Sequence, residues 1–98
     1  MKVKKSIHFM EWYNQLKDSR AKAKIALRIV QTELGNLGDS KSVGDGVFEM
    51  RIHYGPGFRL YYSIENGEVV FLLIGGDKSS QQRDIEKAKE IRKDVADD

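Results

Sequence analysis

Two segments with alternating polarity carry the side chains most suited to chemistry in this 98-residue chain. Between Phe48 and Ile64, apolar and polar residues alternate on both sides of a Gly55-Pro56-Gly57 turn. Residues two apart on a strand share a face, so the polar residues should line one side of a hairpin. Guanidinium groups hold phosphate oxygens bidentately, and we interpret this side as an anion-binding face. Its residues are Glu49, Arg51, His53, Arg59, Tyr61 and Ser63, with Lys78 after the next strand.

Such a face suits RNA cleavage without a metal ion. The 2′-OH attacks the adjacent phosphorus, cations stabilise the doubly charged phosphorane, and an acid protonates the 5′ leaving oxygen. Arg51, Arg59 and Lys78 are the candidate catalytic cations. Histidine has an ordinary pKa near neutrality, so His53 is a catalytic candidate for proton transfer, with Glu49 as an alternative. A lone hairpin histidine is, however, more often structural.

Further residues are candidates for RNA binding. Tyr54 and Tyr61 have rings on which bases could stack, although core packing is the alternative for Tyr54. Residues 1–46 carry nine Lys or Arg against five Asp or Glu, in a chain whose net charge is +2. A basic segment fits a nucleic acid or an acidic partner, and a solvated helix face explains it equally well. Lys22, Lys24 and Arg28 are its candidate RNA contacts.

Composition excludes several classes of function. The chain has no cysteine and only two histidines, so thiolate chemistry is excluded and we predict no metal site and no cofactor. The longest apolar run, Val69–Ile74, is far shorter than the roughly 20 residues of a membrane helix. The Met1–Lys5 start lacks the apolar region of a signal peptide. We therefore expect one cytoplasmic domain over residues 1–98 that contacts no membrane.

The elements that position these residues follow from apolar spacing. A short strand is predicted over Val3–His8, followed by a helix with an apolar stripe from Phe9 to Leu16. Asp18 or Ser19 should cap a second helix, giving an αα-hairpin. The residues expected on the buried side of that second helix are Ala26, Ile29, Val30, Leu34 and Leu37.

The second half of the chain predicts a meander of three antiparallel strands. A three-residue Gly55–Gly57 loop keeps the faces of the first hairpin consistent, and it places His53 opposite Arg59 and Arg51 opposite Tyr61. An Asn66-Gly67 turn then leads into Val69–Ile74. A final helix begins near Ser80, with Ile85, Ala88, Ile91 and Val95 on one side. The predicted fold class is a small α+β domain: N-terminal strand, α-hairpin, three-strand meander and C-terminal helix.

Taken together, these motifs resemble a known family. Residues 49–52 (EMRI), 54–62 (YGPGFRLYY) and 75–81 (GGDKSSQ) are similar to the RelE/HigB-type "addiction module killer" toxins of bacterial type II toxin–antitoxin systems. The resemblance implies a RelE/ParE-like fold, ribosome-dependent cleavage of messenger RNA, and inhibition by a helix-turn-helix antitoxin. It matches Arg59 to an arginine that acts on the scissile phosphate, and Arg51 to the position of a catalytic lysine. Lys78 falls near residues that assist the leaving group, whereas Ile85 stands where some relatives have a stacking aromatic.

The same fold also serves other functions, because fold does not determine activity. One alternative is a non-enzymatic, ParE-like poison of DNA gyrase that acts through its surface helices. Another is an inactive relative that only binds its antitoxin. For the nuclease, removal of the charges at Arg51 and Arg59 should abolish toxicity, while a gyrase poison should tolerate it.

Overall fold

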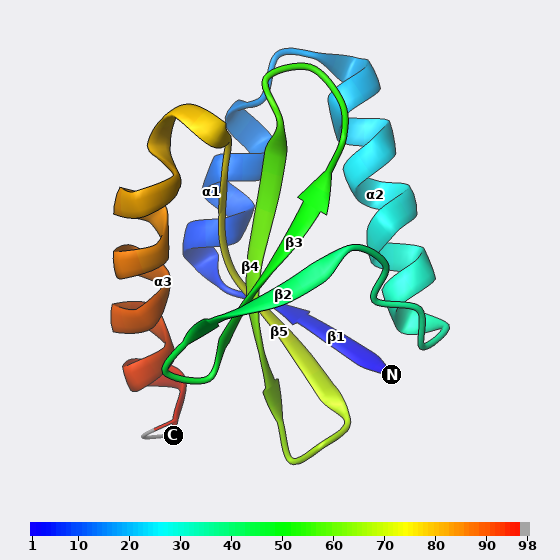
Figure 1. Cartoon of the computed structure of the whole chain (residues 1–98). Helices are drawn as coiled ribbons and strands as arrows, with labels where there is room; N and C mark the ends of the chain where they lie inside the picture. The colour runs from blue at the N-terminus through cyan, green and yellow to red at the C-terminus, as the bar shows by residue number, and fades with distance from the viewer. Residues whose placement is uncertain (97–98) are drawn as a thin grey trace.

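The computed structural model contains a five-stranded sheet with the order β1-β5-β4-β3-β2 (Figure 1). The structure describes residues 1–96, so Asp97 and Asp98 of the predicted domain lie outside the described residues. Strand β1 pairs with β5 in parallel, and all other neighbouring strands are antiparallel. The strands are β1 (Lys2–Lys5), β2 (Ser40–Gly44), β3 (Val47–Ile52), β4 (Phe58–Glu65) and β5 (Val69–Gly76).

Helices cover both faces of the sheet. Helices α1 (Ile7–Gln15) and α2 (Ser19–Glu33) pack on one face through Phe9, Ala21 and Ile25. The short helix η1 (Lys78–Ser80) leads into α3 (Gln81–Ala96), which packs on the other face through Ala88 and Ile91. The β3–β4 loop, the α1–α2 connection and the start of α3 all lie at the same end of the molecule (Figure 1). Within residues 1–96, no helix has the length and apolar character that crossing a bilayer requires.

The predicted α+β class is confirmed, with one strand more than expected. Strand β2 extends the three-strand meander and pairs with β3. Its sequence, Ser40–Gly44, contains a single large apolar residue and therefore gives no alternating signal. The first strand is shorter than predicted, because the Ser6 side chain accepts a hydrogen bond from the Phe9 N–H and begins α1.

The buried side of α2 differs from the prediction. Ala21, Ile25, Ile29 and Thr32 are buried, whereas Val30 and Leu34 are exposed. This helix carries two apolar stripes, and periodicity does not tell which one meets the sheet. The expected cap is present, since the Asp18 carboxylate accepts hydrogen bonds from the N–H groups of Arg20 and Ala21.

The register of the first hairpin also corrects the prediction. Arg51 pairs with Arg59, Glu49 pairs with Tyr61, and the loop contains the five residues 53–57. The observed register differs from the predicted one by two residues, which leaves every side chain on its face, so alternation cannot distinguish the two registers. The longer loop is closed by the Gly57 N–H, which donates to the Tyr54 carbonyl, and φ is positive at Gly55 and Gly57.

Candidate functional site

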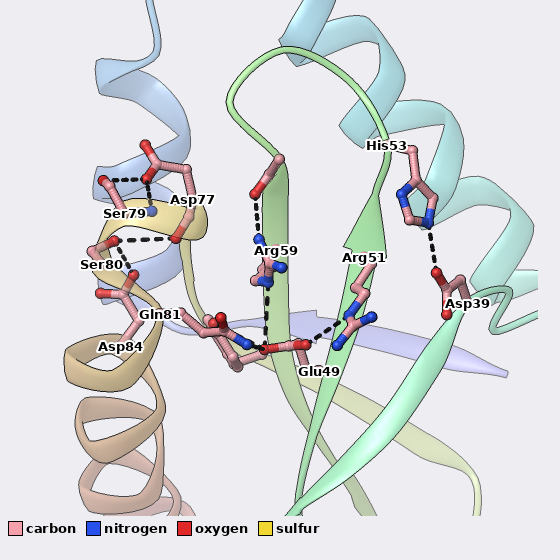
Figure 2. Close-up of polar contacts among 12 residues, drawn as sticks. Asp39, Glu49, Arg51, His53, Arg59, Asp77, Ser79, Ser80, Gln81 and Asp84 are labelled. Atoms are coloured by element: carbon pink, nitrogen blue, oxygen red, sulfur yellow. Dashed lines mark hydrogen bonds and ion pairs between the residues drawn. The ribbon is translucent and has the colours of Figure 1, made fainter.

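A buried carboxylate organises the cationic face. The Glu49 side chain in β3 is fully buried, yet it lies among charged groups. Its Oε1 accepts a hydrogen bond from Arg51 Nε at 3.0 Å. Its Oε2 accepts one from Gln81 Nε2 at 2.9 Å and one from the Tyr61 hydroxyl at 3.3 Å. Arg59 Nε forms an ion pair with the same Oε2 at 3.5 Å (Figure 2). Each carboxylate oxygen is therefore occupied.

The two guanidiniums lie on neighbouring strands at directly opposed positions. Like charges in this arrangement are destabilising, so the pair needs a counter-charge, and Glu49 supplies it. The Arg51 side chain is 34% exposed and the Arg59 side chain 11% exposed. Arg59 Nη1 also donates to the Gly57 carbonyl at 2.8 Å, which directs this side chain toward the β3–β4 loop (Figure 2). Two positive charges share one negative charge, and the site keeps a net charge of about +1.

The ionisation states follow from these contacts. Burial raises the pKa of the Glu49 carboxyl, but hydrogen bonds from Arg51 and Gln81 and the charge of Arg59 outweigh it, so the net pKa is lowered. Burial, followed by the charge of Glu49, raises the pKa of the Tyr61 hydroxyl. The hydrogen bond to Glu49 raises the pKa of Arg51. The resting site thus contains a carboxylate, a neutral phenol and two guanidiniums.

Lys78 lies at the rim of this site. Its side chain is exposed, its N–H donates to the Pro56 carbonyl at 3.4 Å, and η1 therefore rests against the β3–β4 loop. A Cβ added at Gly57 would lie 3.3 Å from Arg59 Nη1 and 3.6 Å from Lys78 Cβ. The absence of a side chain at Gly57 thus leaves room for the Arg59 guanidinium and for Lys78. The Asp77 carboxylate caps η1 by accepting from the Ser79 N–H.

His53 is separated from the arginines. Its ring Nε2 lies 2.6 Å from Asp39 Oδ2, and both side chains are largely exposed. The hydrogen bond with His53 lowers the pKa of Asp39. Figure 2 shows His53 directed toward Asp39, away from Arg51 and Arg59. The expected pairing of His53 with Arg59 is therefore wrong, because His53 belongs to the five-residue loop rather than to the strand.

The residues predicted to bind RNA fall into different environments. Tyr61 is fully buried and its hydroxyl is bonded to Glu49, so the structure contradicts its assignment as a base-stacking residue. Arg28 donates to three backbone carbonyls, which gives it a structural role. Lys22 lies over the Tyr13 ring, 5.5 Å from its centroid. Tyr54 is half-buried and packs against the hydrophobic core, which agrees with the alternative of core packing, and Lys24 Nζ lies 5.2 Å from its ring centroid.

Two functional contacts escaped the sequence analysis. Gln81 contacts Glu49 across 32 residues of sequence, and Asp39 contacts His53 across 14 residues. No local spacing pattern predicts such contacts. The two glycines of the 75–81 motif have a packing role. Gly75 and Gly76 belong to β5, where a Cβ would collide with the Trp12 ring and with the Asp84 carboxylate, respectively.

Comparison with known proteins identifies the family. The family described as "Phage derived protein Gp49-like" matches residues 11–95. The chain belongs to this family. One relative is an uncharacterized protein of Haemophilus influenzae. It is 47% identical to this chain over 95 residues, which cover 97% of this chain and 96% of the relative.

Solved structures of the Escherichia coli toxin RelE share the fold of this Gp49-like protein. A RelE mutant in the free state superposes with a TM-score of 0.70 at 19% identity, covering 92% of this chain and 96% of RelE. The toxin chain of the intact RelBE toxin–antitoxin complex gives a TM-score of 0.64 at 18% identity, over 78% and 94% of the two chains. RelE in complex with an antitoxin RelB peptide gives 0.64 at 14% identity, over 87% and 90%. The predicted RelE-like fold is thus confirmed.

Proposed function

We propose that this Gp49-like protein is the toxin of a type II toxin–antitoxin system and inhibits translation in the cytoplasm. Its proposed activity is metal-independent, ribosome-dependent endonucleolytic cleavage of messenger RNA. The support is the RelE fold together with a cationic cluster on β3 and β4, beside the β3–β4 loop against which η1 rests. The RelE structures that contain the antitoxin RelB support a cognate antitoxin as the partner of this chain.

One observation carries the proposal: the excess positive charge of the Arg51–Glu49–Arg59 cluster. The protein places two guanidiniums opposite each other, and within residues 1–96 Glu49 is the one carboxylate that forms ion pairs with them. A phosphodiester supplies the missing negative charge, and its phosphorane transition state supplies two charges. Cations fixed before the reaction therefore stabilise the transition state more than the ground state.

In the proposed reaction, the 2′-oxygen forms a bond to phosphorus and the bond to the 5′-oxygen breaks. The 2′-OH proton passes to water, and the leaving 5′-oxygen takes a proton from the Lys78 ammonium, which water then reprotonates. Arg59 contacts the scissile phosphate, Arg51 polarises the 2′-OH, and Lys78 assists the leaving oxygen from the rim. Glu49 acts as a positioning residue rather than a base, because both of its oxygens already accept hydrogen bonds.

Inhibition by the antitoxin has two candidate surfaces. An acidic or apolar segment lying over Arg51 and Arg59 would neutralise the site by occupying it. The basic helices of the N-terminal half are the other surface. Wild-type RNA binding by the intact toxin–antitoxin complex would contradict the first arrangement.

The test is inducible expression followed by primer extension on a translated message. We expect growth arrest and in-frame cuts with wild type, and cleavage about 10²–10³-fold slower with Arg59→Ala or Arg51→Ala, as for the loss of one oxyanion-hole donor. Lys93→Ala is the charge-matched control, because this exposed lysine lies in the last turn of α3, at the opposite end of that helix.

Arrest without cuts in wild type and Arg59→Ala alike would favour the gyrase-poison alternative. The absence of arrest in wild type would indicate a toxin-fold protein that only binds its antitoxin. Either result would overturn the nuclease proposal.

A further inference from the structure

A small groove lies between α2 and the end of β3, on the opposite face of the sheet from the Arg51–Glu49–Arg59 cluster. Its volume is about 190 Å³. One wall is a single face of α2, because its residues are spaced at i, i+3, i+4 and i+7. The other wall is the end of β3 and the start of the following loop. The lining residues are Lys24, Leu27, Arg28 and Gln31 from α2, with Ile52, His53 and Tyr54 opposite.

The groove contains a cation and two aromatic rings. Lys24 Nζ lies 5.2 Å from the centroid of the Tyr54 ring, and Lys24 forms no ion pair within residues 1–96. The Tyr54 hydroxyl donates to Asp18 at 3.0 Å, and the His53 ring is held by Asp39 at 2.6 Å. Two rings are thus oriented by carboxylates beside a cation that lacks an anionic partner.

This combination fits one nucleotide. A base can stack on an aromatic ring and contact Leu27, the Gln31 amide can donate to and accept from a base edge, and Lys24 can pair with a phosphate. The volume is below the roughly 300–1,000 Å³ of sites for drug-sized ligands, so a single base fits better than a bulky side-chain cluster of a protein partner.

Hydrogen bonds of Arg28 connect the groove to the arginine cluster on the other face of the sheet. Arg28 Nη1 donates to the carbonyl of Arg51 at 2.8 Å, and the same guanidinium donates to the carbonyls of Leu37 and Asp39. Arg28, a lining residue of the groove, is therefore bonded to the strand that carries Arg51. Both surfaces lie beside the β3–β4 loop, because His53 and Tyr54 belong to that loop and Arg59 Nη1 donates to the Gly57 carbonyl within it.

We propose that this groove binds a nucleotide of single-stranded RNA that neighbours the cleaved one, with Tyr54 and Lys24 as its main contacts. The inference rests on the proposed function, which supplies an RNA strand at the arginine cluster. The strand crosses the β3–β4 loop, and one of its bases enters the groove. His53 is then an RNA-contacting residue rather than the base of the reaction.

The test is fluorescence anisotropy with a short, labelled single-stranded RNA whose 2′-positions are all O-methylated, so that cleavage cannot occur. We expect Tyr54→Ala and Lys24→Ala to weaken binding about tenfold each. Lys24→Ala should also reduce the slope of log affinity against log salt by about 0.7, whereas Tyr54→Ala should leave the slope unchanged. Tyr54→Phe should restore the lost affinity, because it keeps the ring, and Lys93→Ala should bind as wild type does.

Wild-type affinity in both Tyr54→Ala and Lys24→Ala would overturn the inference, as would an equal loss of affinity in Lys93→Ala. Failure of Tyr54→Phe to restore binding would show that the hydroxyl, not the ring, matters, and would also overturn it. Because the probe cannot be cleaved, the result is independent of the expression test. If wild type cuts messages in the expression test but the groove variants bind RNA as wild type does, the proposed function stands and only this inference is wrong.

Discussion

Glu49 is the residue on which the geometry of the site depends. A fully buried carboxylate is costly unless it is paired and hydrogen-bonded, and here Arg51, Tyr61, Gln81 and Arg59 all surround it. Gln81 is the first residue of α3, so the same carboxylate connects that helix to the two strands that carry the arginines. Loss of the charge at Glu49 should therefore disturb stability and activity together.

Glu49→Gln tests this role, because it keeps the shape of the side chain and removes its charge. We expect the free energy of unfolding to fall by about 3 kcal/mol, since Arg59 is left nearly buried without a counter-charge. Urea denaturation measures the change, and cleavage should fall with it. Glu90→Gln, on an exposed part of α3, should change stability by less than about 0.5 kcal/mol. Equal stability of the two variants would contradict the assignment.

The pH dependence of stability gives a second test of the same carboxylate. The pKa of Glu49 in the folded protein lies below its ordinary value of 4.5. Its ionised form therefore stabilises the folded protein above that value, and this contribution is lost as the pH falls through the lowered pKa. We expect the difference in unfolding free energy between wild type and Glu49→Gln to be constant near neutrality and to shrink below about pH 4.5. Because Asp18 and Asp39 are present in both proteins, their lowered pKa values cancel in this difference. If the difference in unfolding free energy instead grew in acid, the pKa of Glu49 would be raised in the folded protein rather than lowered.

At the scale of elements, the end of β5 shows why glycines are needed where two layers approach the sheet. Gly75 faces the Trp12 ring of α1, and Gly76 faces Asp84 of α3. Trp12 in turn packs against Phe9 and Phe58, which leaves the ring little room to move. The strand therefore admits no side chain at these two positions.

Gly75→Ala should be destabilising by about 3 kcal/mol, at the upper end of the usual cost of overpacking. Chemical denaturation of Gly75→Ala, Trp12→Leu and the double variant measures the coupling. We expect the double variant to lose clearly less than the sum of the single variants, because the smaller side chain makes room for the added methyl group. Simple additivity would mean that the Trp12 contact is not the cause.

At the scale of the whole molecule, Arg28 ties one helical layer to the sheet. Its guanidinium joins α2 to the connection before β2 and to the strand that carries Arg51. A lysine has a compact ammonium group that cannot reproduce this fork of donors. We expect Arg28→Lys to lower the free energy of unfolding by about 1.5–3 kcal/mol and to speed hydrogen exchange at the Arg51 N–H. Arg20→Lys, at an exposed position of the same helix, is the control and should leave both quantities unchanged.

The sequence by itself was sufficient for the α+β class, the order of most elements, the family resemblance and the shared face of Arg51 and Arg59. These properties depend on local periodicity and on short contiguous motifs, which are visible along the chain. Tertiary structure alone decided the direct pairing of the two arginines, because a register shift of two residues preserves the alternation. It also decided the buried side of α2, because both of its apolar stripes are compatible with a helix. The burial of Tyr61, the central place of Glu49 and the contact with Gln81 depend on α3 folding back over the sheet, and that packing joins residues far apart in the sequence.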